Sequence, residues 1–246
     1  RVDSDLFLNV RGSYDYIVVA LGAHKEKKLF GREEGGALIE DGLQFLSRIS
    51  SGALKHLPGH VKHVAVIGGG NTAIDVSRSA LRLGADKVTI VYRRTEEAMP
   101  AHKDEIELAK KEGVRFMFLT APRSVKVTSI RGVRLDCIRM MMQEAQDESG
   151  RQKPVEVPGS EFAVAADLVV SAIGEVADIG AVLPASFHFE TERDIRDDKV
   201  LCVGDALYGP RSVSEAIASG KLAAQTIIDR VRGAQHIATK REVAGE

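Results

Sequence analysis

The stretch "HVAVIGGGNTAIDVSRSALRLGADKVTIVYRR" (residues 63–94) decides the fold of this chain. It opens with an apolar run, His63–Ile67, that is followed at once by glycines and predicts a short buried strand. Gly68, Gly70 and Ala73 come next at the spacing G-x-G-x-x-A, and the apolar residues after them recur with helical spacing. A second apolar run closes the stretch. The whole pattern predicts a βαβ unit with a tight glycine turn between its first strand and its helix.

The small residues of this turn each meet a different physical requirement. Gly68 permits a sharp turn, Gly70 lets the backbone approach a pyrophosphate, and Ala73 lets helix and strand pack closely. The helix that begins at Asn71 offers unpaired N–H groups and positive potential at its amino end, and Gly84 is placed to end it. Because strands are predicted on both sides, we interpret the pattern as a dinucleotide-binding site. The alternative is a glycine turn without a ligand.

Two arginines, Arg93 and Arg94, stand at the predicted end of the second strand. That position normally meets the adenosine ribose, where an acidic residue would accept hydrogen bonds from the 2′-OH of NAD and repel a 2′-phosphate. Guanidinium groups reverse this preference, because their forked donors suit a phosphate. The pair therefore favours NADP(H) over NAD(H), and the alternative interpretation is a solvated basic turn.

Composition limits the possible functions. The chain has 246 residues and a formal net charge of −1, which gives no reason to expect nucleic acid or an anionic membrane as a partner. No apolar run approaches the ~20 residues that span a bilayer, and the first residues do not resemble a signal peptide. Two cysteines, Cys137 and Cys202, do not make a disulfide framework, so a cytoplasmic location is expected. The chain lacks an initiating Met, and we expect it to be a segment of something longer.

A sequence pattern that occurs twice in the chain predicts the domain organisation. "DYIVVALG" (Asp15–Gly22) and "DLVVSAIG" (Asp167–Gly174) each read as a buried strand that ends in a tight turn. One precedes and the other follows the βαβ unit, which suggests a nucleotide-binding domain inserted between two pieces of another domain. The expected boundaries are a partial flavin-domain segment with linker at 1–56, the NADPH-binding domain at 57–165, and a second flavin-domain segment at 166–246.

Other elements follow from local patterns. Residues 42–49 predict a short amphipathic helix, and Pro100 is expected to open a helix that Gly113 ends. Residues 124–142 predict two strands joined by a turn at positions 131 and 132, and residues 143–159 predict an exposed loop or hairpin tip. In the last block, Asp205 follows a predicted strand, where it can cap a helix or bond a ligand hydroxyl.

Taken together, these residues resemble the NADPH-binding domain of the glutamate synthase small (beta) subunit family of FAD-dependent pyridine nucleotide oxidoreductases. The match rests on "VAVIGGGNTAIDVSRSALRLGADKVTIVYRRTEEAMPAHKDEIELAKKEGVRF" and on the flanking "YDYIVVALGA", "ADLVVSAIGE" and "VLCVGDALYGPRSVSEAIASGKLAA". The resemblance extends from about residue 14 to 231. It implies an α/β fold in which a Rossmann-like NAD(P)-binding domain is inserted in a partial FAD-binding domain of the glutathione-reductase type.

The resemblance also implies cofactor-binding positions, and it implies neither a catalytic side chain nor a metal ligand. Those implied for NADPH are Gly68, Gly69, Gly70, Asn71 and Thr72 at the pyrophosphate, Arg93 and Arg94 at the 2′-phosphate, and Ala172, Ile173 and Gly174 near the nicotinamide. Those implied for FAD are Ala20, Leu21, Gly22, Gly204 and Asp205, with Ser212 and Val213 facing the isoalloxazine. In that family NADPH gives a hydride to FAD, and electrons pass on to iron–sulfur clusters and a partner subunit.

The sequence departs from the family pattern in three places. The first FAD fingerprint and the upstream cysteine clusters that bind iron–sulfur centres are missing from it, so the chain alone is expected to bind FAD poorly or not at all and not to turn over. Glu175 stands where the family usually has Gln, and the segment before the strand at residue 200 is shorter than expected.

Three other functions compete with this reading. A self-contained NADP-dependent dehydrogenase would need a proton-relay residue, and His102, just before a predicted helix, is better explained as a solvated terminus. A thioredoxin-reductase-like disulfide enzyme would need a C-x-x-C pair, which Cys137 and Cys202 do not form. The third is a stand-alone NADP(H)-binding or subunit-docking module without turnover.

Overall fold

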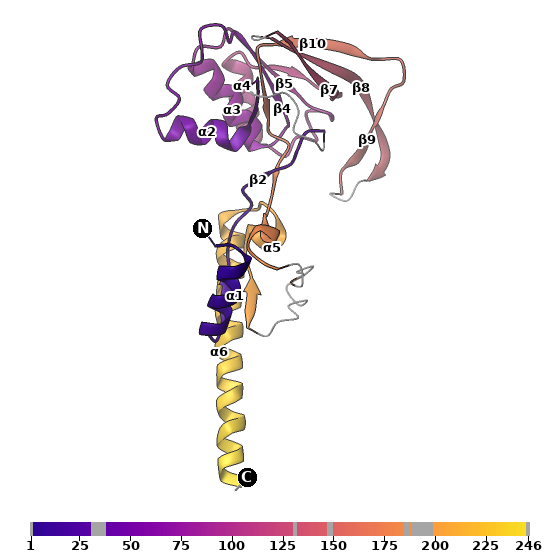
Figure 1. Ribbon diagram of the computed structural model, residues 1–246. Coiled ribbons are helices and arrows are strands. Elements are labelled where there is room, and N and C mark those ends of the chain that lie inside the picture. The colour runs from indigo at the N-terminus through magenta and orange to yellow at the C-terminus, as the bar shows by residue number, and fades with distance from the viewer. Residues whose placement is uncertain are drawn as a thin grey trace. The chain divides into compact units, whose positions relative to one another are not determined.

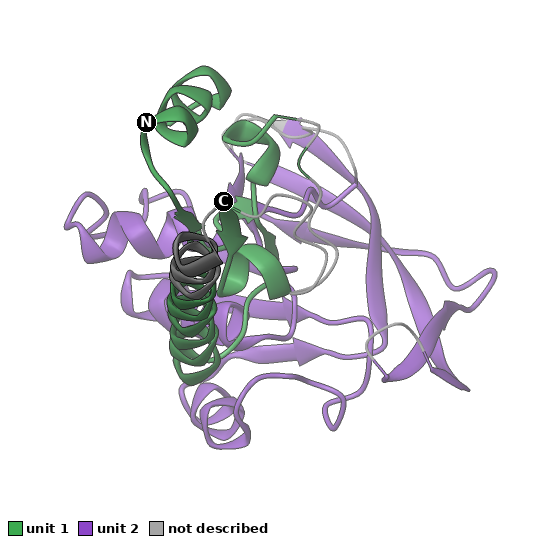
Figure 2. Ribbon diagram, turned by 90° about the horizontal axis from the view of Figure 1, so that it is seen from below, with its two compact units in different colours: residues 1–25, 175–246 green, residues 26–174 purple. Residues whose placement is uncertain are grey.

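The computed structural model describes residues 2–30, 38–129, 132–146, 150–184, 187 and 199–244. The chain divides into two compact units: unit 1 comprises residues 1–25 and 175–246, and unit 2 comprises residues 26–174 (Figure 1; Figure 2). The chain passes from unit 1 to unit 2 within β2 (Lys25–Glu26) and returns just before β12 (Glu175–Val176).

Unit 2 is built on a five-stranded parallel sheet. The strands, in their order across the sheet, are β3 (Ile39–Asp41), β11 (Leu168–Ser171), β4 (His63–Ile67), β5 (Lys87–Val91) and β6 (Arg115–Met117). β4 has β5 on one side and β11 on the other, so the strand order reverses at β4. In open α/β sheets, such a reversal point at the carboxyl ends of the strands is where ligands bind.

Three helices cover one face of this sheet (Figure 1). They are α2 (Gly42–Ser50), α3 (Asn71–Arg82) and α4 (Lys103–Lys111). Val64 and Val66 of β4 pack with Ala73 of α3 in one buried cluster, and all three side chains are fully buried. The predicted role of Gly84 is confirmed: with a φ of +101°, it lets its N–H and that of Ala85 bond back to α3 carbonyls.

An antiparallel sheet covers the opposite face. Its strands are β7 (Thr120–Ser129), β8 (Gly132–Gln146) and β10 (Phe162–Ala166), and β9 (Gln152–Glu156) pairs with the far half of β8. Consecutive strand residues point to opposite faces, so Ala65 and Ile67 of β4 face away from the helices. They pack with Val125 and Leu135 of the antiparallel sheet in a second buried cluster.

Unit 1 contains a two-stranded parallel sheet of β1 (Ile17–Val19) and β13 (Val200–Cys202). Its helical elements are α1 (Ser4–Ser13), a 3-10 turn at Ile179–Ala181, α5 (Asp205–Tyr208) and the long α6 (Val213–Ala244). Phe7, Leu183 and Val200 lie in its largest buried cluster. Within the described part of the chain, no helix has the length and apolar character needed to cross a membrane.

The structure differs from the sequence-based boundaries in an informative way. The expected NADPH-binding domain was 57–165, but unit 2 extends from 26 to 174 because α2 and β3 join its layers and β11 lies inside its sheet. The two strands of the repeated sequence pattern are therefore not equivalent, because β1 belongs to unit 1 and β11 belongs to unit 2. β1 comes shortly before the chain leaves unit 1 for the first time, and β11 is the last strand before the chain leaves unit 2.

Two local predictions were displaced by a few residues. The helix expected to open at Pro100 begins at Lys103, with His102 as its N-cap. The strand expected to carry both arginines ends at Val91, so Arg93 and Arg94 lie in the connection that follows it. The predicted strand pair around residue 131 is confirmed as β7 and β8, although residues 130 and 131 lie outside the described chain. The expected hairpin tip is β8–β9, of which residues 147–149 lie outside the described chain.

Candidate functional site: the carboxyl edge of the parallel sheet

The candidate site lies where the strands of unit 2 end. Because the five strands are parallel, the segments that follow β4, β5 and β11 meet at one edge of the sheet. The register pairs Ile67 with Val91 and with Ser171, so these three strand ends are level. The glycine turn, the arginine pair and residues 172–174 are thereby brought to the same edge.

The three glycines of the turn face three different surroundings. A Cβ on Gly68, whose φ is +143°, would lie 2.1 Å from the carbonyl oxygen of Ala172. A Cβ on Gly69 would lie 2.4 Å from the ring of Tyr92, whereas a Cβ on Gly70 would meet no atom within 4 Å. Gly68 and Gly69 are therefore required by the protein's own packing. Gly70 borders open space, which is the space that a ligand's phosphates would need.

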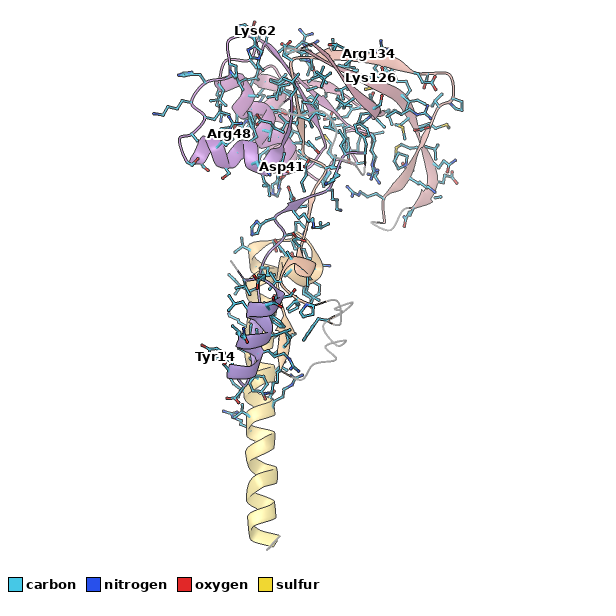
Figure 3. The ribbon with its side chains drawn as sticks, in the orientation of Figure 1. Tyr14, Asp41, Arg48, Lys62, Lys126 and Arg134 are labelled. Carbon is cyan, nitrogen blue, oxygen red and sulfur yellow. The ribbon has the colours of Figure 1, made fainter. Side chains whose placement is uncertain are left out.

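The amino ends of α2 and α3 differ in how they are capped. Asp41 caps α2, because its Oδ1 accepts a hydrogen bond of 2.7 Å from the N–H of Gln44 (Figure 3). The N-cap of α3 is Gly70, which has no side chain to accept such a bond. The first N–H groups of α3 therefore point toward the space beside Gly70 with the positive end of the helix dipole behind them, an arrangement that suits an anion.

The segment between β5 and α4 holds the glycine turn in place. Tyr92 lies over Gly69, and its Oη donates a 2.8 Å hydrogen bond to the carbonyl of Ala98. The N–H of Ala101 donates to the carbonyl of Gly69 at 3.3 Å, and the N–H of His102 donates to Oδ1 of Asn71 at 3.1 Å. This bracing was missed by the sequence reasoning. An aromatic residue directly before the arginines was the only signal of it.

The two arginines have different environments. Arg93 is exposed to solvent, whereas Arg94 is only 2% exposed. Nε of Arg94 donates a 3.2 Å hydrogen bond to the carbonyl of Gln152, near the tip of the β8–β9 hairpin. Of the two arginines, Arg93 is the one whose side chain is exposed to solvent.

Residues 172–174 leave β11 at the reversal point of the sheet. The N–H of Ala172 donates to the carbonyl of Ile67 at 2.7 Å, which ties this segment to the end of β4. Gly174 has a φ of +102° and no neighbour that a Cβ would meet within 4 Å. Ser171, just before them, is 1% exposed, and no atom of the described chain is a hydrogen-bond partner for its hydroxyl.

The positions expected for FAD all lie in unit 1. β1 and β13 are parallel and pair Val19 with Cys202, so residues 20–22 and 203–205 follow level strand ends. The N–H of Gly204 donates to Oγ of Ser219 at 2.8 Å, and Oδ1 of Asp205 accepts from the N–H of Arg211 at 3.1 Å.

The start of α6 is capped by its own residues. Glu215 Oε2 accepts from the N–H of Ser212 at 3.0 Å, and Oγ of Ser212 accepts from the N–H of Glu215 at 3.3 Å. Oγ of Ser212 also donates to Oε2 of Glu215 at 2.6 Å, and this hydrogen bond, together with the one from the N–H of Ser212, lowers the pKa of Glu215. Val213, which opens the helix, is 76% exposed. The polar groups at this end are thus already paired, as in a capping box.

Thiol and metal chemistry find no support at the site. Burial raises the pKa of Cys137 to about 11 and that of Cys202 to about 11, so both thiols are protonated at neutral pH. The two cysteines lie in different units. Among the described residues, no cluster of His, Cys, Asp and Glu is suited to hold a metal ion.

A parallel sheet with an uncapped helix after a glycine turn at its reversal point defines a Rossmann-type dinucleotide-binding protein. The chain belongs to the pyridine nucleotide-disulphide oxidoreductase family, whose sequence pattern matches residues 8–220. This confirms the α/β fold expected from the sequence. Solved structures agree: Mycobacterium tuberculosis FprA in complex with NADPH superposes with a TM-score of 0.66 at 18% identity, over 92% of this chain and 66% of that one.

Curated relatives confirm the resemblance to the glutamate synthase small chain. The NADP(+)-dependent formate dehydrogenase subunit beta of Moorella thermoacetica is 37% identical over 246 residues, covering 94% of this chain and 34% of the relative. A putative glutamate synthase [NADPH] small chain of Cereibacter sphaeroides is 32% identical over 248 residues, covering 93% of this chain and 59% of the relative. This chain thus spans between one third and three fifths of the length of these two proteins.

Proposed function

We propose that this chain is the NADP(H)-binding part of an FAD-dependent oxidoreductase that passes a hydride from NADPH to FAD and electrons onward to iron–sulfur clusters or a partner subunit. One observation carries the proposal: the uncapped amino end of α3 opens beside Gly70, at the same edge as the exposed Arg93. Relatives named as the beta subunit of an NADP(+)-dependent dehydrogenase and as an NADPH-dependent small chain support it.

The residues of unit 2 have distinct roles in this proposal. Gly69 and Gly70, with Asn71 and Thr72 at the start of α3, hold the pyrophosphate through backbone N–H groups, while Gly68, whose N–H is bonded to the carbonyl of Val91, forms the turn. Arg93 donates to the 2′-phosphate, and residues 172–174 lie beside the nicotinamide. When bound, NADPH supplies the hydride, so this chain's residues need only bind and orient it.

The flavin side of the proposal rests on unit 1. Residues 20–22 and 203–205 follow two level parallel strands, the arrangement that a second nucleotide site would use. A two-stranded sheet with a self-capped helix offers fewer unpaired donors than the turn of unit 2 does. We therefore propose that FAD is held in the full-length protein, and that this chain alone retains little of it.

A second candidate is a stand-alone NADP(H)-binding or subunit-docking module without turnover. Apolar side chains along α6 favour it, because Val213, Ile217 and Leu222 are all more than half exposed. The two candidates share the NADP(H) site. They differ in whether the full-length protein holds flavin, which the absorbance of flavin released from that protein would decide.

The central experiment is calorimetric titration of the chain with NADP(H) and, separately, with NAD(H). We expect preferential binding of NADP(H), and we expect Arg93→Ala to weaken it roughly tenfold to hundredfold, the loss of one charge-assisted hydrogen bond. Arg134→Ala is the matched control, because that exposed arginine lies on β8 and pairs with Asp136 at 2.7 Å (Figure 3). Equal affinity for both cofactors, or an equal effect of the two substitutions, would refute the proposal.

A further inference from the structure

Arg94 is a buried cation that the proposed function leaves without a direct task. It is the largest of the fully buried side chains among the described residues. Burying a guanidinium is costly unless hydrogen bonds compensate it. A buried side chain of this kind affects the site through the residues to which it is hydrogen-bonded.

Arg94 touches the antiparallel sheet at two points. Its carbonyl accepts a 3.1 Å hydrogen bond from the N–H of Leu119, and the carbonyl of Leu119 in turn accepts from Met140 of β8 at 2.8 Å. Its Nε donates to the carbonyl of Gln152, which is the first residue of β9 and lies 58 positions along the chain. Arg94 thus joins the end of β5 directly to β9 and, through Leu119, to β8.

This contact brings the start of β9 to the side chain of Arg94. Arg151 immediately precedes Gln152 and is partly exposed. Because the carbonyl of Gln152 is bonded to Nε of Arg94, Arg151 is next in sequence to a residue that touches the neighbour of Arg93. A doubly charged phosphate is better held by two guanidinium groups than by one.

We infer that Arg151 is a further specificity-determining residue for the 2′-phosphate of NADP(H), and that Arg94 is the positioning residue that holds it there. This inference rests on the proposed function. In it, Arg93 and Arg151 contact the phosphate from two sides, while Arg94 remains buried and fixes the hairpin. The 2′-phosphate site is then assembled from two segments far apart in the sequence.

The test uses two small probes, 2′,5′-ADP and 5′-AMP, which differ only in the 2′-phosphate. Calorimetric affinities would be measured for the whole chain and for Arg151→Ala, Arg93→Ala and the control Arg134→Ala. We expect Arg151→Ala to weaken 2′,5′-ADP about tenfold and to leave 5′-AMP unchanged, and we expect the loss to shrink at high salt. Arg134→Ala should change neither affinity.

The role of Arg94 is tested by a double-mutant cycle. Arg94→Lys keeps the charge but changes the donor geometry, so it should weaken 2′,5′-ADP binding in the otherwise unchanged chain. In the Arg151→Ala background it should have little further effect, because it acts through Arg151. Additive losses would show that Arg94 acts by itself, or only on stability, and would overturn this part of the inference.

The outcomes separate the inference from the function on which it rests. If Arg93→Ala weakens 2′,5′-ADP and Arg151→Ala does not, the inference fails and the proposed NADP(H) site stands. If the unchanged chain binds both probes equally, the proposed preference for NADP(H) fails and the inference fails with it.

Discussion

Two turns in this molecule share the succession of strand, glycine and helix, but they differ in the surroundings of their glycines and helix ends. In unit 2 the parallel strand β4 is followed by Gly68, which has a φ of +143°, and the chain leads on into α3. In unit 1 the parallel strand β13 is followed, after Val203, by Gly204, which has a φ of +62°, and the chain leads on into α5. The N–H of Gly204 is bonded to Ser219, whereas Gly70 borders open space at an uncapped helix end.

The difference separates the anion site that we propose in unit 2 from a glycine turn of the same succession in unit 1. A strand, a glycine and a helix are common to both turns, so this succession alone does not create one. The turn in unit 2 has free space beside a helix end without a side-chain cap, and its strand has parallel neighbours on both sides. In unit 1, β13 is paired with β1 alone within the described chain, and nearby side chains use the polar groups.

The largest effects on stability are expected when a methyl group is added to each of the two glycines that follow these strands. Gly68→Ala should destabilise the chain by roughly 4 kcal/mol or more, because its Cβ would lie 2.1 Å from the Ala172 carbonyl oxygen at a positive φ. Gly204→Ala should cost about 1–3 kcal/mol, from backbone strain alone, since its nearest neighbour is 3.7 Å away. Urea unfolding measures both. Equal losses would show that the close approach at Gly68 does not matter.

A finer test separates packing from ligand binding within the turn of unit 2. Gly70→Ala should leave the stability within about 0.5 kcal/mol, because its Cβ meets nothing within 4 Å and its φ is −88°. It should nevertheless weaken NADP(H) binding at least about tenfold, since the methyl group occupies the space for the pyrophosphate.

Gly69→Ala is the paired variant for that test. Its Cβ would meet the Tyr92 ring at 2.4 Å, so we expect a loss of stability of about 1–3 kcal/mol. Thermal unfolding would measure the stability of both variants, and calorimetric titration would measure their affinity for NADP(H). A Gly70→Ala chain with unchanged affinity would move the phosphate site away from this turn.

The smallest effect is expected at the capped helix of unit 1. Ser212→Ala should destabilise the chain by about 0.5–2 kcal/mol through loss of the cap, without changing NADP(H) affinity. Hydrogen bonds from Ser212 lower the pKa of Glu215 in the folded chain. This contribution is therefore present above the ordinary pKa of a glutamate and is lost as the pH falls through the lowered value.

The measurement is urea unfolding of the Ser212→Ala and unchanged chains as a function of pH. The difference between their stabilities should narrow at acidic pH, where Glu215 is protonated in the folded and in the unfolded chain, and the part due to the N–H of Glu215 bonding to Oγ of Ser212 should remain. A difference that stays constant down to acidic pH would show that the carboxylate takes no part in the cap.

The sequence was sufficient to predict the βαβ unit, because periodicity and glycine spacing are local properties of residues 63–94. It predicted α2, the end of α3 at Gly84 and the β7–β8 pair for the same reason. The domain boundaries were less accessible, since the run at Leu168–Ser171 reads as a buried strand without indicating which sheet it joins.

The sequence indicated which residues follow β4, β5 and β11, but it did not indicate how the environments of those residues differ. Arg93 and Arg94 look equivalent in sequence. In the structure, Arg93 is exposed, whereas Arg94 is buried and bonded to the distant carbonyl of Gln152. The packing of Tyr92 over Gly69 is likewise a tertiary contact. Such contacts depend on how the sheets are assembled, which local patterns do not encode.

The crossings between the units have a consequence for protein engineering. Close to where unit 2 begins and ends, the N–H of Lys27 donates to the carbonyl of Gly174 at 3.1 Å, so its two ends lie side by side. Inserted domains with adjacent ends are readily excised, transplanted or circularly permuted. Residues 26–174 thus form a cassette that can be moved as a block, and a host loop would need to open by only one strand spacing to accept it.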